Sequence, residues 1–363
     1  LPTWGLAMSD LSNRSIVTIR AKSHAYSVLI GQGLIKELLD GDQPLIVADR
    51  RFQGMLESQG RFGCIYIDAV ESSKNLSTVE DVIISLQKLG ARSNSKVLAI
   101  GGGIIQDIMT LVASLYMRGI AWIYVPTTLL AMADSCVGGK SSINTKTVKN
   151  LIGNIFPPET IYADTDFVLT LSDEDFSAGL AEASKICFCK GAEEFQKFLS
   201  LSSSKSPEYL AQMLPLVLNA KKWFVEIDEF DHSERKQLNF GHTFGHALEV
   251  GSSYGIAHGL AVASGVKAAM IYESKSRDLS KVEEQFMLFA DSLVNGPKFK
   301  WTSDDIDWES YASALNADKK HSAAEYVLLL PNAGGGVRVQ RIEKSAEVLS
   351  AMIDAQKQSL GRP

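Results

Sequence analysis

The chain has 363 residues, a formal net charge of −6 at pH 7 and 45% apolar residues, all ordinary values for a globular protein. This length is enough for one large domain or two medium ones. This negative net charge does not indicate the basic surface that nucleic-acid binding requires. No apolar run reaches the roughly 18–20 residues that a membrane-spanning helix needs. Composition therefore excludes nucleic-acid-binding and membrane-spanning proteins.

The four cysteines are Cys64, Cys136, Cys187 and Cys189, too few and too scattered for a disulfide framework. Cys187 and Cys189 form a C-x-C pair, but no second pair supports a metal site. We therefore interpret them as small buried apolar residues. The first residues have no signal-peptide pattern, and Met8 is a candidate natural start. These features predict a cytoplasmic protein.

In the first half of the chain, short apolar strands alternate with helices, which predicts a doubly wound parallel sheet. We expect strands at residues 15–19, 26–30, 44–48, 64–68, 96–100 and 120–125. We expect helices at residues 34–39 and 77–89, and a long apolar helix that follows Gly101-Gly102-Gly103 and runs to Met117.

The pattern changes near Leu169, where acidic helix starts and apolar residues at helical spacing appear. Residues 200–206 are expected to form an exposed loop, and the only later strand candidate is 326–330. The sequence thus predicts an α/β domain over residues 1–168 and a mostly helical domain over residues 169–363.

A glycine triplet, Gly101 to Gly103, lies between an expected strand and a helix. Such a turn lets phosphate oxygens approach the helix N-terminus. Gln106 stands where the third glycine of the dinucleotide fingerprint would be, so a plain tight turn is the alternative. Asp49, at the end of an earlier strand, could accept ribose hydroxyls or cap a helix.

A second candidate is an anion-binding loop in which Gly138 and Gly139 precede Lys140. Asp134 precedes it, and Lys149 and Asn150 follow as further polar groups. The spacing does not match a P-loop. A solvated surface loop remains the alternative.

The strongest pattern is a histidine cluster. His242 and His246, four residues apart, share a helix face, and His258 follows. Glu182 lies in an apolar helix, and a buried carboxylate needs a cationic partner or a metal. Two histidines and one glutamate with an open position form a known catalytic zinc set. The H-E-x-x-H motif of metalloproteases is absent, and structurally inert histidines remain the alternative.

Ten motifs occur in one order along the chain: GGG-x-x-x-D, Y-x-R-G, V-P-T-T-L-L, D-S-x-V-G-G-K, K-N-L-I-G, D-T-D-F, A-G-L-A-E-x-x-K, L-N-F-G-H-T-F-G-H-A-L-E, H-G-x-A-V-A and D-K-K. Over about residues 45–335 the chain resembles 3-dehydroquinate synthase and related sugar phosphate cyclases. The resemblance implies an N-terminal Rossmann-like domain, a helical C-terminal domain, and an active site in the cleft between them.

The resemblance also implies roles for individual residues. The metal, Zn²⁺ or Co²⁺, would be bound by Glu182, His242 and His258. NAD would be bound by Asp49, Glu71, Lys74, Gly102, Gly103, Asp107, Thr127, Thr128, Lys149, Phe167 and Thr170. The implied catalytic residues are Lys140, Lys185, Lys221, Arg235, Asn239 and His246. The implied substrate-binding residues are Arg118, Asp134, Asn150 and one of Lys319 and Lys320, with Arg118 reaching in from the other subunit of a homodimer.

The implied reaction converts 3-deoxy-D-arabino-heptulosonate 7-phosphate to 3-dehydroquinate and phosphate. It proceeds by transient oxidation with NAD, β-elimination of phosphate, re-reduction and an intramolecular aldol step, with the metal as Lewis acid. Lysine and arginine side chains suit an anionic sugar phosphate, and Arg235 suits bidentate carboxylate contact.

Departures from the family pattern bear on substrate identity. They are Gln106, Ser141-Ser142, Thr145–Val148 and Ile186–Cys189. His246 argues against sedoheptulose 7-phosphate cyclases, and Lys221 with Arg235 favours a carboxylate substrate.

The alternatives belong to three classes. The first is a cyclase for another sugar phosphate, of the 2-deoxy-scyllo-inosose synthase type or from secondary metabolism or a polysaccharide cluster. The second is an iron-type NAD-dependent polyol dehydrogenase. The third is a non-catalytic binding module.

Overall fold

The computed structural model describes residues 14–22, 24–40, 44–295, 299 and 301–361. The candidate start at Met8 lies outside the described residues. By contacts the chain divides into two compact units, Leu1–Leu171 with Ser202–Phe230 and Ser172–Leu201 with Asp231–Pro363. No helix in the described ranges has both the length and the apolar character needed to cross a membrane.

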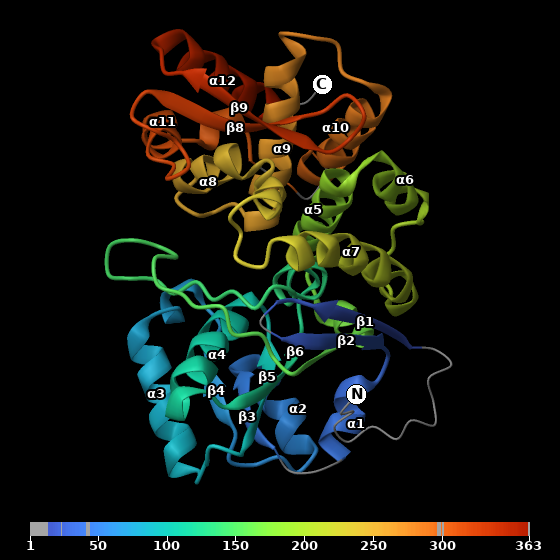
Figure 1. Cartoon of the computed structure of the whole chain (residues 1–363), viewed down its shortest axis with the longest axis vertical. Coiled ribbons are helices and arrows are strands. Elements are labelled where there is room, and N and C mark those ends of the chain that lie inside the picture. Colours follow the sequence, from blue (N-terminus) through green and yellow to red (C-terminus); the bar gives the residue numbers. More distant parts are fainter. Residues whose placement is uncertain (1–13, 23, 41–43, 296–298, 300, 362–363) are drawn as a thin grey trace. The chain divides into compact units, whose positions relative to one another are not determined.

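The first unit is built on a sheet whose seven described strands have the order β1-β2-β7-β6-β5-β3-β4 (Figure 1). β1 pairs antiparallel with β2, and all the other pairings are parallel. The strands are β1 Ser15–Arg20, β2 Ala25–Gly31, β3 Leu45–Asp49, β4 Ile65–Ile67, β5 Lys96–Gly101, β6 Ala121–Pro126 and β7 Thr160–Asp164. The predicted parallel α/β sheet is confirmed.

Strand β7 was not expected from the sequence. It lies between β2 and β6, and all five of its residues are buried. Its apolar segment, Ile161 to Ala163, is short and has polar neighbours on both sides. A strand that short cannot be identified by periodicity alone, because its partners are supplied by distant segments.

Helices cover this sheet, and one of them comes from the second half of the chain. They are α1 Leu34–Asp40, α2 Gln53–Ser58, α3 Leu76–Lys88, α4 Gly103–Leu115 and α7 Pro207–Ile227. Shorter helical turns are η1 Arg50–Phe52, η2 Glu71–Ser73, η3 Tyr116–Arg118, η4 Ala131–Ser135 and η5 Thr165–Thr170.

Helix α7 belongs to the first unit because its apolar face packs on β1, β2 and η5. Two polar contacts reinforce this packing, from Lys221 to Asp134 and from the Arg20 backbone N–H to Glu226. The compact units therefore differ from the expected single boundary between residues 168 and 169, since long-range packing rather than chain order assigns this helix.

The second unit is mostly helical, as predicted. Its helices are α5 Asp173–Lys190, α6 Ala192–Ser200, α8 His242–Gly251, α9 His258–Ser274, α10 Lys281–Val294, α11 Trp308–Asn316 and α12 Ala346–Leu360, with the turns η6 Glu234–Asn239 and η7 Ser303–Asp305. Helix α9 contacts α5, α8, α10, α12 and β8. It is buried around its circumference, as expected for a central helix.

A β-hairpin completes this unit, with β8 Glu325–Pro331 and β9 Val337–Glu343 pairing antiparallel. Strand β8 matches the predicted strand. The expectation that no other strand follows was wrong. Only Val337 of β9 is fully buried, and Arg338, Arg341 and Glu343 make its sequence look polar.

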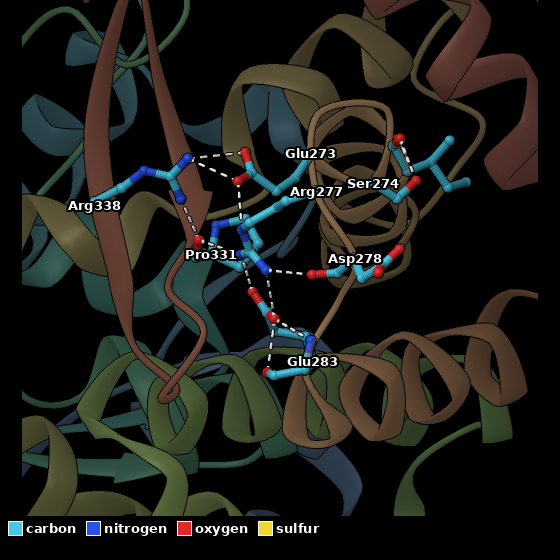
Figure 2. Close-up of polar contacts among 9 residues, drawn as sticks. Glu273, Ser274, Arg277, Asp278, Glu283, Pro331 and Arg338 are labelled. Atoms are coloured by element: carbon cyan, nitrogen blue, oxygen red, sulfur yellow. Dashed lines mark hydrogen bonds and ion pairs between the residues drawn. The ribbon is translucent and has the colours of Figure 1, made fainter.

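Ion pairs with buried carboxylates connect the hairpin to α9 and α10 (Figure 2). Arg277 Nε lies 2.7 Å from Glu273 Oε1, and its Nη1 donates to Glu283 Oε2 at 3.0 Å. Arg338 contacts both Glu273 oxygens at 2.8 and 2.9 Å. Arg277 also donates to the Pro331 carbonyl at 3.0 Å. Because the Glu273 and Glu283 side chains are only 5% and 0% exposed, these two arginines are needed as their charge partners.

Candidate active site

Three helices of the second unit bring the predicted metal ligands together. Glu182 lies on α5, His242 on α8, and His258 begins α9. Gly259 lets α9 approach α5 closely, because a Cβ at this position would lie only 2.1 Å from the Ala178 carbonyl oxygen. Ala178 precedes Glu182 by about one helical turn. The close approach therefore places His258 beside Glu182.

Glu182 is buried, with a side chain that is 1% exposed. Its Oε1 lies 3.5 Å from His258 Nε2 and 3.8 Å from His242 Nε2, while Oε2 pairs with Lys185. Among the described residues, Oε1 has no hydrogen-bond partner. A buried carboxylate oxygen that faces two ring nitrogens and has no donor fits a divalent cation.

The other ring nitrogen of each histidine has an acceptor. His242 Nδ1 lies 3.2 Å from the Phe240 carbonyl oxygen, and His258 Nδ1 lies 3.2 Å from Glu249 Oε1. Both contacts favour a proton on Nδ1 and leave the Nε2 lone pair for a metal. No role for Glu249 was predicted from the sequence. The available signal was its position seven residues, about two helical turns, after His242.

His246 adds a third imidazole to the cluster. Its ring lies 5.1 Å from that of His242 and 5.7 Å from that of His258. One ligand nitrogen from each of the three lies within 4.8 Å of the others, so a three-histidine set is a geometric alternative to the set containing Glu182.

The electrostatics around His242 suit a metal ligand. Burial, and then the charge of Lys185, hold the pKa of His242 well below its usual value, and a metal needs the neutral ring. Burial opposes the charged form of His258. The hydrogen bond to Glu249 and the charges of Glu249 and Glu182 nevertheless raise its pKa.

The first unit contains the expected strand–turn–helix at the glycine triplet. A Cβ at Gly101 would lie 2.3 Å from Ile105 Cγ1, and one at Gly102 would lie 3.0 Å from Thr128 Cγ2. The turn therefore excludes a larger residue at Gly101 and leaves little room for one at Gly102. Gln106 is buried and exchanges two hydrogen bonds of 2.6 Å with Ser135, which explains why a long side chain is tolerated here.

Four predicted binding residues meet around the Lys74 amine. It lies 2.9 Å from Asp107 Oδ2, 3.0 Å from Asn150 Oδ1 and 3.8 Å from Glu71 Oε1. The Ser142 N–H donates to Asp107 Oδ1 at 2.9 Å. Burial raises the pKa of Asp107 to about 6, although Lys74 opposes this shift. The group joins predicted cofactor residues to Asn150, a predicted substrate residue.

Arg51 connects two other predicted cofactor residues. Asp49 caps η1 by accepting from the Arg51 N–H at 3.1 Å, and its Oδ2 lies 3.1 Å from Arg51 Nε. Arg51 also donates to Thr127 Oγ1 at 3.2 Å. The Phe167 ring packs edge-on against Phe52 at 5.3 Å. Of the two interpretations of Asp49, the helix cap is the one that the structure shows.

Several other predicted residues of the first unit contact each other or residues of their own turn. Lys221 lies 2.7 Å from Asp134 Oδ1, which brings two predicted residues together. Thr128 accepts from the Ala131 N–H, and Thr170 donates to the Phe167 carbonyl, each within its own turn. Lys149 lies exposed on its loop. The backbone of Lys140 forms an isolated antiparallel β-bridge with Ile155.

Arg118 is exposed in a strained turn. Met117, Arg118 and Gly119 have φ values of 47°, 69° and 131°. Consecutive non-glycine residues with positive φ are uncommon and cluster at functional sites.

The remaining residues of the second unit lie on loops and turns. Lys320 Nζ is 2.8 Å from Asp318 Oδ2, and Lys319 is exposed. After burial and the larger effects of Lys185, His246 and His258, the charge of Lys320 also lowers the pKa of His242. Arg235 is buried in η6, where Asn239 donates to the Lys236 carbonyl at 3.1 Å.

Two family models together match most of the chain. The model for the 3-dehydroquinate synthase N-terminal region matches residues 64–178, and the C-terminal model matches residues 179–321. A 3-dehydroquinate synthase of Rhodopirellula baltica is 33% identical over 84% of this chain and 82% of its own. That of Dictyoglomus thermophilum is 31% identical over 92% and 96%.

Solved structures show the same fold. A 2-deoxy-scyllo-inosose synthase complexed with carbaglucose-6-phosphate, NAD⁺ and Co²⁺ has a TM-score of 0.81 at 22% identity, over 95% of this chain and 99% of its own. The 2-epi-5-epi-valiolone synthase of Streptomyces hygroscopicus, with NAD⁺ and Zn²⁺, has a TM-score of 0.77 at 25% identity, over 92% and 97%. The family models and the curated relatives show that the chain belongs to the 3-dehydroquinate synthase family.

Proposed function

We propose that this protein is an NAD- and metal-dependent sugar phosphate cyclase that converts 3-deoxy-D-arabino-heptulosonate 7-phosphate to 3-dehydroquinate and phosphate. The observation that carries the proposal is the buried Glu182 Oε1 facing His242 and His258. Family membership and relatives that are 3-dehydroquinate synthases over almost the full chain support this reaction over other chemistries.

The proposed metal ligands are Glu182, His242 and His258, with Zn²⁺ or Co²⁺ as the ion. A divalent ion in this position supplies Lewis acid chemistry at a substrate oxygen. Lys185 pairs with the second Glu182 oxygen and so orients that carboxylate. His246 is left to bind the substrate phosphate, which suits its exposed position beside the cluster.

The proposed NAD site is the glycine turn and the N-terminus of α4. When bound, NAD supplies a transient hydride acceptor. The backbone at Gly102 and Gly103 can approach a pyrophosphate closely, and the first N–H groups of α4 face it. The group around Lys74, Asp107 and Asn150 supplies further donors and acceptors.

The substrate is anionic, and cationic and polar side chains are assigned to it. The proposed contacts are Lys140, Asn150, Lys221, Arg235, Asn239 and His246. Between the two neighbouring lysines we choose Lys320 over Lys319. Its charge acts on His242, and Asp318 restrains its amine.

We also propose a cytoplasmic homodimer in which Arg118 serves the partner subunit's site. All four cysteines are free thiols, as is usual in a reducing compartment. The exposed, strained turn at Arg118 suits a side chain presented to another subunit.

The test is to incubate the protein with NAD, Zn²⁺ or Co²⁺, and the heptulosonate phosphate. Released phosphate, the carbocyclic product and NADH absorbance are followed together. We expect phosphate and dehydroquinate in equal amounts, with no net NADH. Release of phosphate only from glucose 6-phosphate or sedoheptulose 7-phosphate would move the substrate elsewhere in the family. Stoichiometric NADH from simple polyols would instead identify a dehydrogenase.

A further inference from the structure

The two histidines that face Glu182 differ in what holds their Nδ1 atoms. His242 Nδ1 lies 3.2 Å from a neutral backbone carbonyl, that of Phe240. His258 Nδ1 lies at the same distance, 3.2 Å, from an ionisable carboxylate, Glu249 Oε1. A carboxylate behind an imidazole fixes the ring orientation and makes the opposite nitrogen a stronger ligand. The two rings are therefore not equivalent as metal ligands.

The backbone at Glu249 is itself held in place. The residue lies near the C-terminal end of α8, the helix that also carries His242 and His246. Its carbonyl oxygen accepts from the Tyr254 N–H at 2.6 Å and from the Ser252 hydroxyl at 3.1 Å. Ser253 and Tyr254 have φ values of 52° and 60°, an unfavourable conformation that persists only where surrounding structure enforces it.

Helix α8 thus acts on the site in two ways. It supplies His242 directly, and through Glu249 it reaches across to His258 at the start of α9. The Glu249 side chain is 17% exposed and the Glu182 side chain is 1% exposed, so both carboxylates lie largely out of water. In such surroundings a charge-assisted hydrogen bond is stronger than at an open surface.

We propose that Glu249 is a positioning residue that accepts the Nδ1 proton of His258 and directs its Nε2 toward the divalent cation. This inference rests on the proposed metal set of Glu182, His242 and His258. Glu249 does not touch the metal or the substrate. Removal of such a partner lowers metal affinity by about 10–100-fold in other metal sites.

The experiment compares Glu249→Gln and Glu249→Ala in the full chain. The first keeps an acceptor oxygen but loses the charge, and the second loses both. Zn²⁺ affinity is measured by competition with a chromogenic chelator. The visible absorption spectrum of the Co²⁺-loaded protein reports the ligand geometry. Urea unfolding of the metal-free protein reports stability.

We expect Zn²⁺ affinity to fall by about 10-fold in Glu249→Gln and by up to about 100-fold in Glu249→Ala. The Co²⁺ bands should shift in both, while the unfolding of the metal-free protein stays close to that of the wild type. Glu284→Gln is the matched control, because it removes the same charge from an exposed position on α10. It should bind both metals like the wild type.

Two results would overturn the proposal. One is wild-type affinity and an unchanged Co²⁺ spectrum in both Glu249 variants. The other is a loss of metal affinity accompanied by an equal loss of metal-free stability, which would mean that Glu249 only supports the fold. The His258→Ala variant distinguishes a failure of the positioning role from a failure of the metal assignment. If it loses Zn²⁺ and the Glu249 variants do not, only the positioning role fails. If it binds Zn²⁺ normally, the metal assignment itself fails.

Discussion

Replacing Gly259 with alanine tests whether the close approach of α5 and α9 builds the metal site. The added Cβ would lie 2.1 Å from the Ala178 carbonyl oxygen and 2.7 Å from its Cα. Ordinary contacts to a Cβ begin near 3.4 Å, so the two helices must separate by about 1.3 Å at this point. Because the obstacle is backbone, no side chain can rotate away to relieve it.

Two consequences are expected from this separation. Overpacking of this kind costs about 1–3 kcal/mol, more than the roughly 1 kcal/mol that alanine gains over glycine inside a helix. The neighbouring residue is His258, whose Nε2 lies 3.5 Å from Glu182 Oε1. Ligand sets tolerate displacements of only about 0.5 Å. We therefore expect Zn²⁺ affinity to fall at least about 10-fold, beyond the effect on stability.

Urea unfolding of the metal-free protein and chelator competition measure the two effects. Gly54→Ala in α2 is the control, because nothing lies within 4 Å of a Cβ there and its φ is ordinary. This control should be unchanged or more stable by up to about 1 kcal/mol. A Gly259→Ala protein with wild-type stability and Zn²⁺ affinity would contradict this prediction. It would show that the spacing of α5 and α9 does not determine the site.

Three further predictions concern other parts of the chain. Arg277→Met should destabilise the protein by about 3–5 kcal/mol in urea unfolding, because it leaves the buried Glu283 carboxylate without its main cation; a change below about 1 kcal/mol would contradict this. The folded-state pKa of Asp107 is raised to about 6. Asp107 therefore stabilises the folded protein fully below about pH 4, and this contribution is lost as the pH rises through about 6. Across that range, the stability of Asp107→Asn relative to the wild type should increase by up to about 3 kcal/mol. A gain that does not change with pH would show that the Asp107 pKa is not raised. Arg118→Ala and Glu182→Gln should each be inactive alone, and mixed subunits should recover about a quarter of the wild-type activity through heterodimers. Full activity of Arg118→Ala alone would remove its role across the dimer.

Much of the fold and several site residues could be predicted because their signals are local. An apolar strand that runs into Gly101 to Gly103 predicts a strand–turn–helix, and the structure has β5 and α4 there. The four-residue spacing of His242 and His246 places both on one face of α8. Helical periodicity after Leu169 predicts the helical second unit. These inferences need only the geometry of one element.

Tertiary structure alone decided which elements meet. Strand β7 is central in its sheet although its sequence is weakly apolar. Helix α7 packs with the first unit, although the chain order suggested the second. Both depend on partners far away in the sequence, and periodicity carries no information about such partners.

The site shows the same division. The residue pattern offered Glu182 and the three clustered histidines as candidate ligands, and the family resemblance selected Glu182, His242 and His258. Neither showed that Glu182 Oε1 is buried between two of the rings. Neither gave a role to Glu249, whose contact with His258 joins two helices. Residue type and spacing determine which chemistry a chain can offer. Distances between helices determine whether these groups act together. Those distances are set by specific packing contacts, such as that of Gly259 against Ala178.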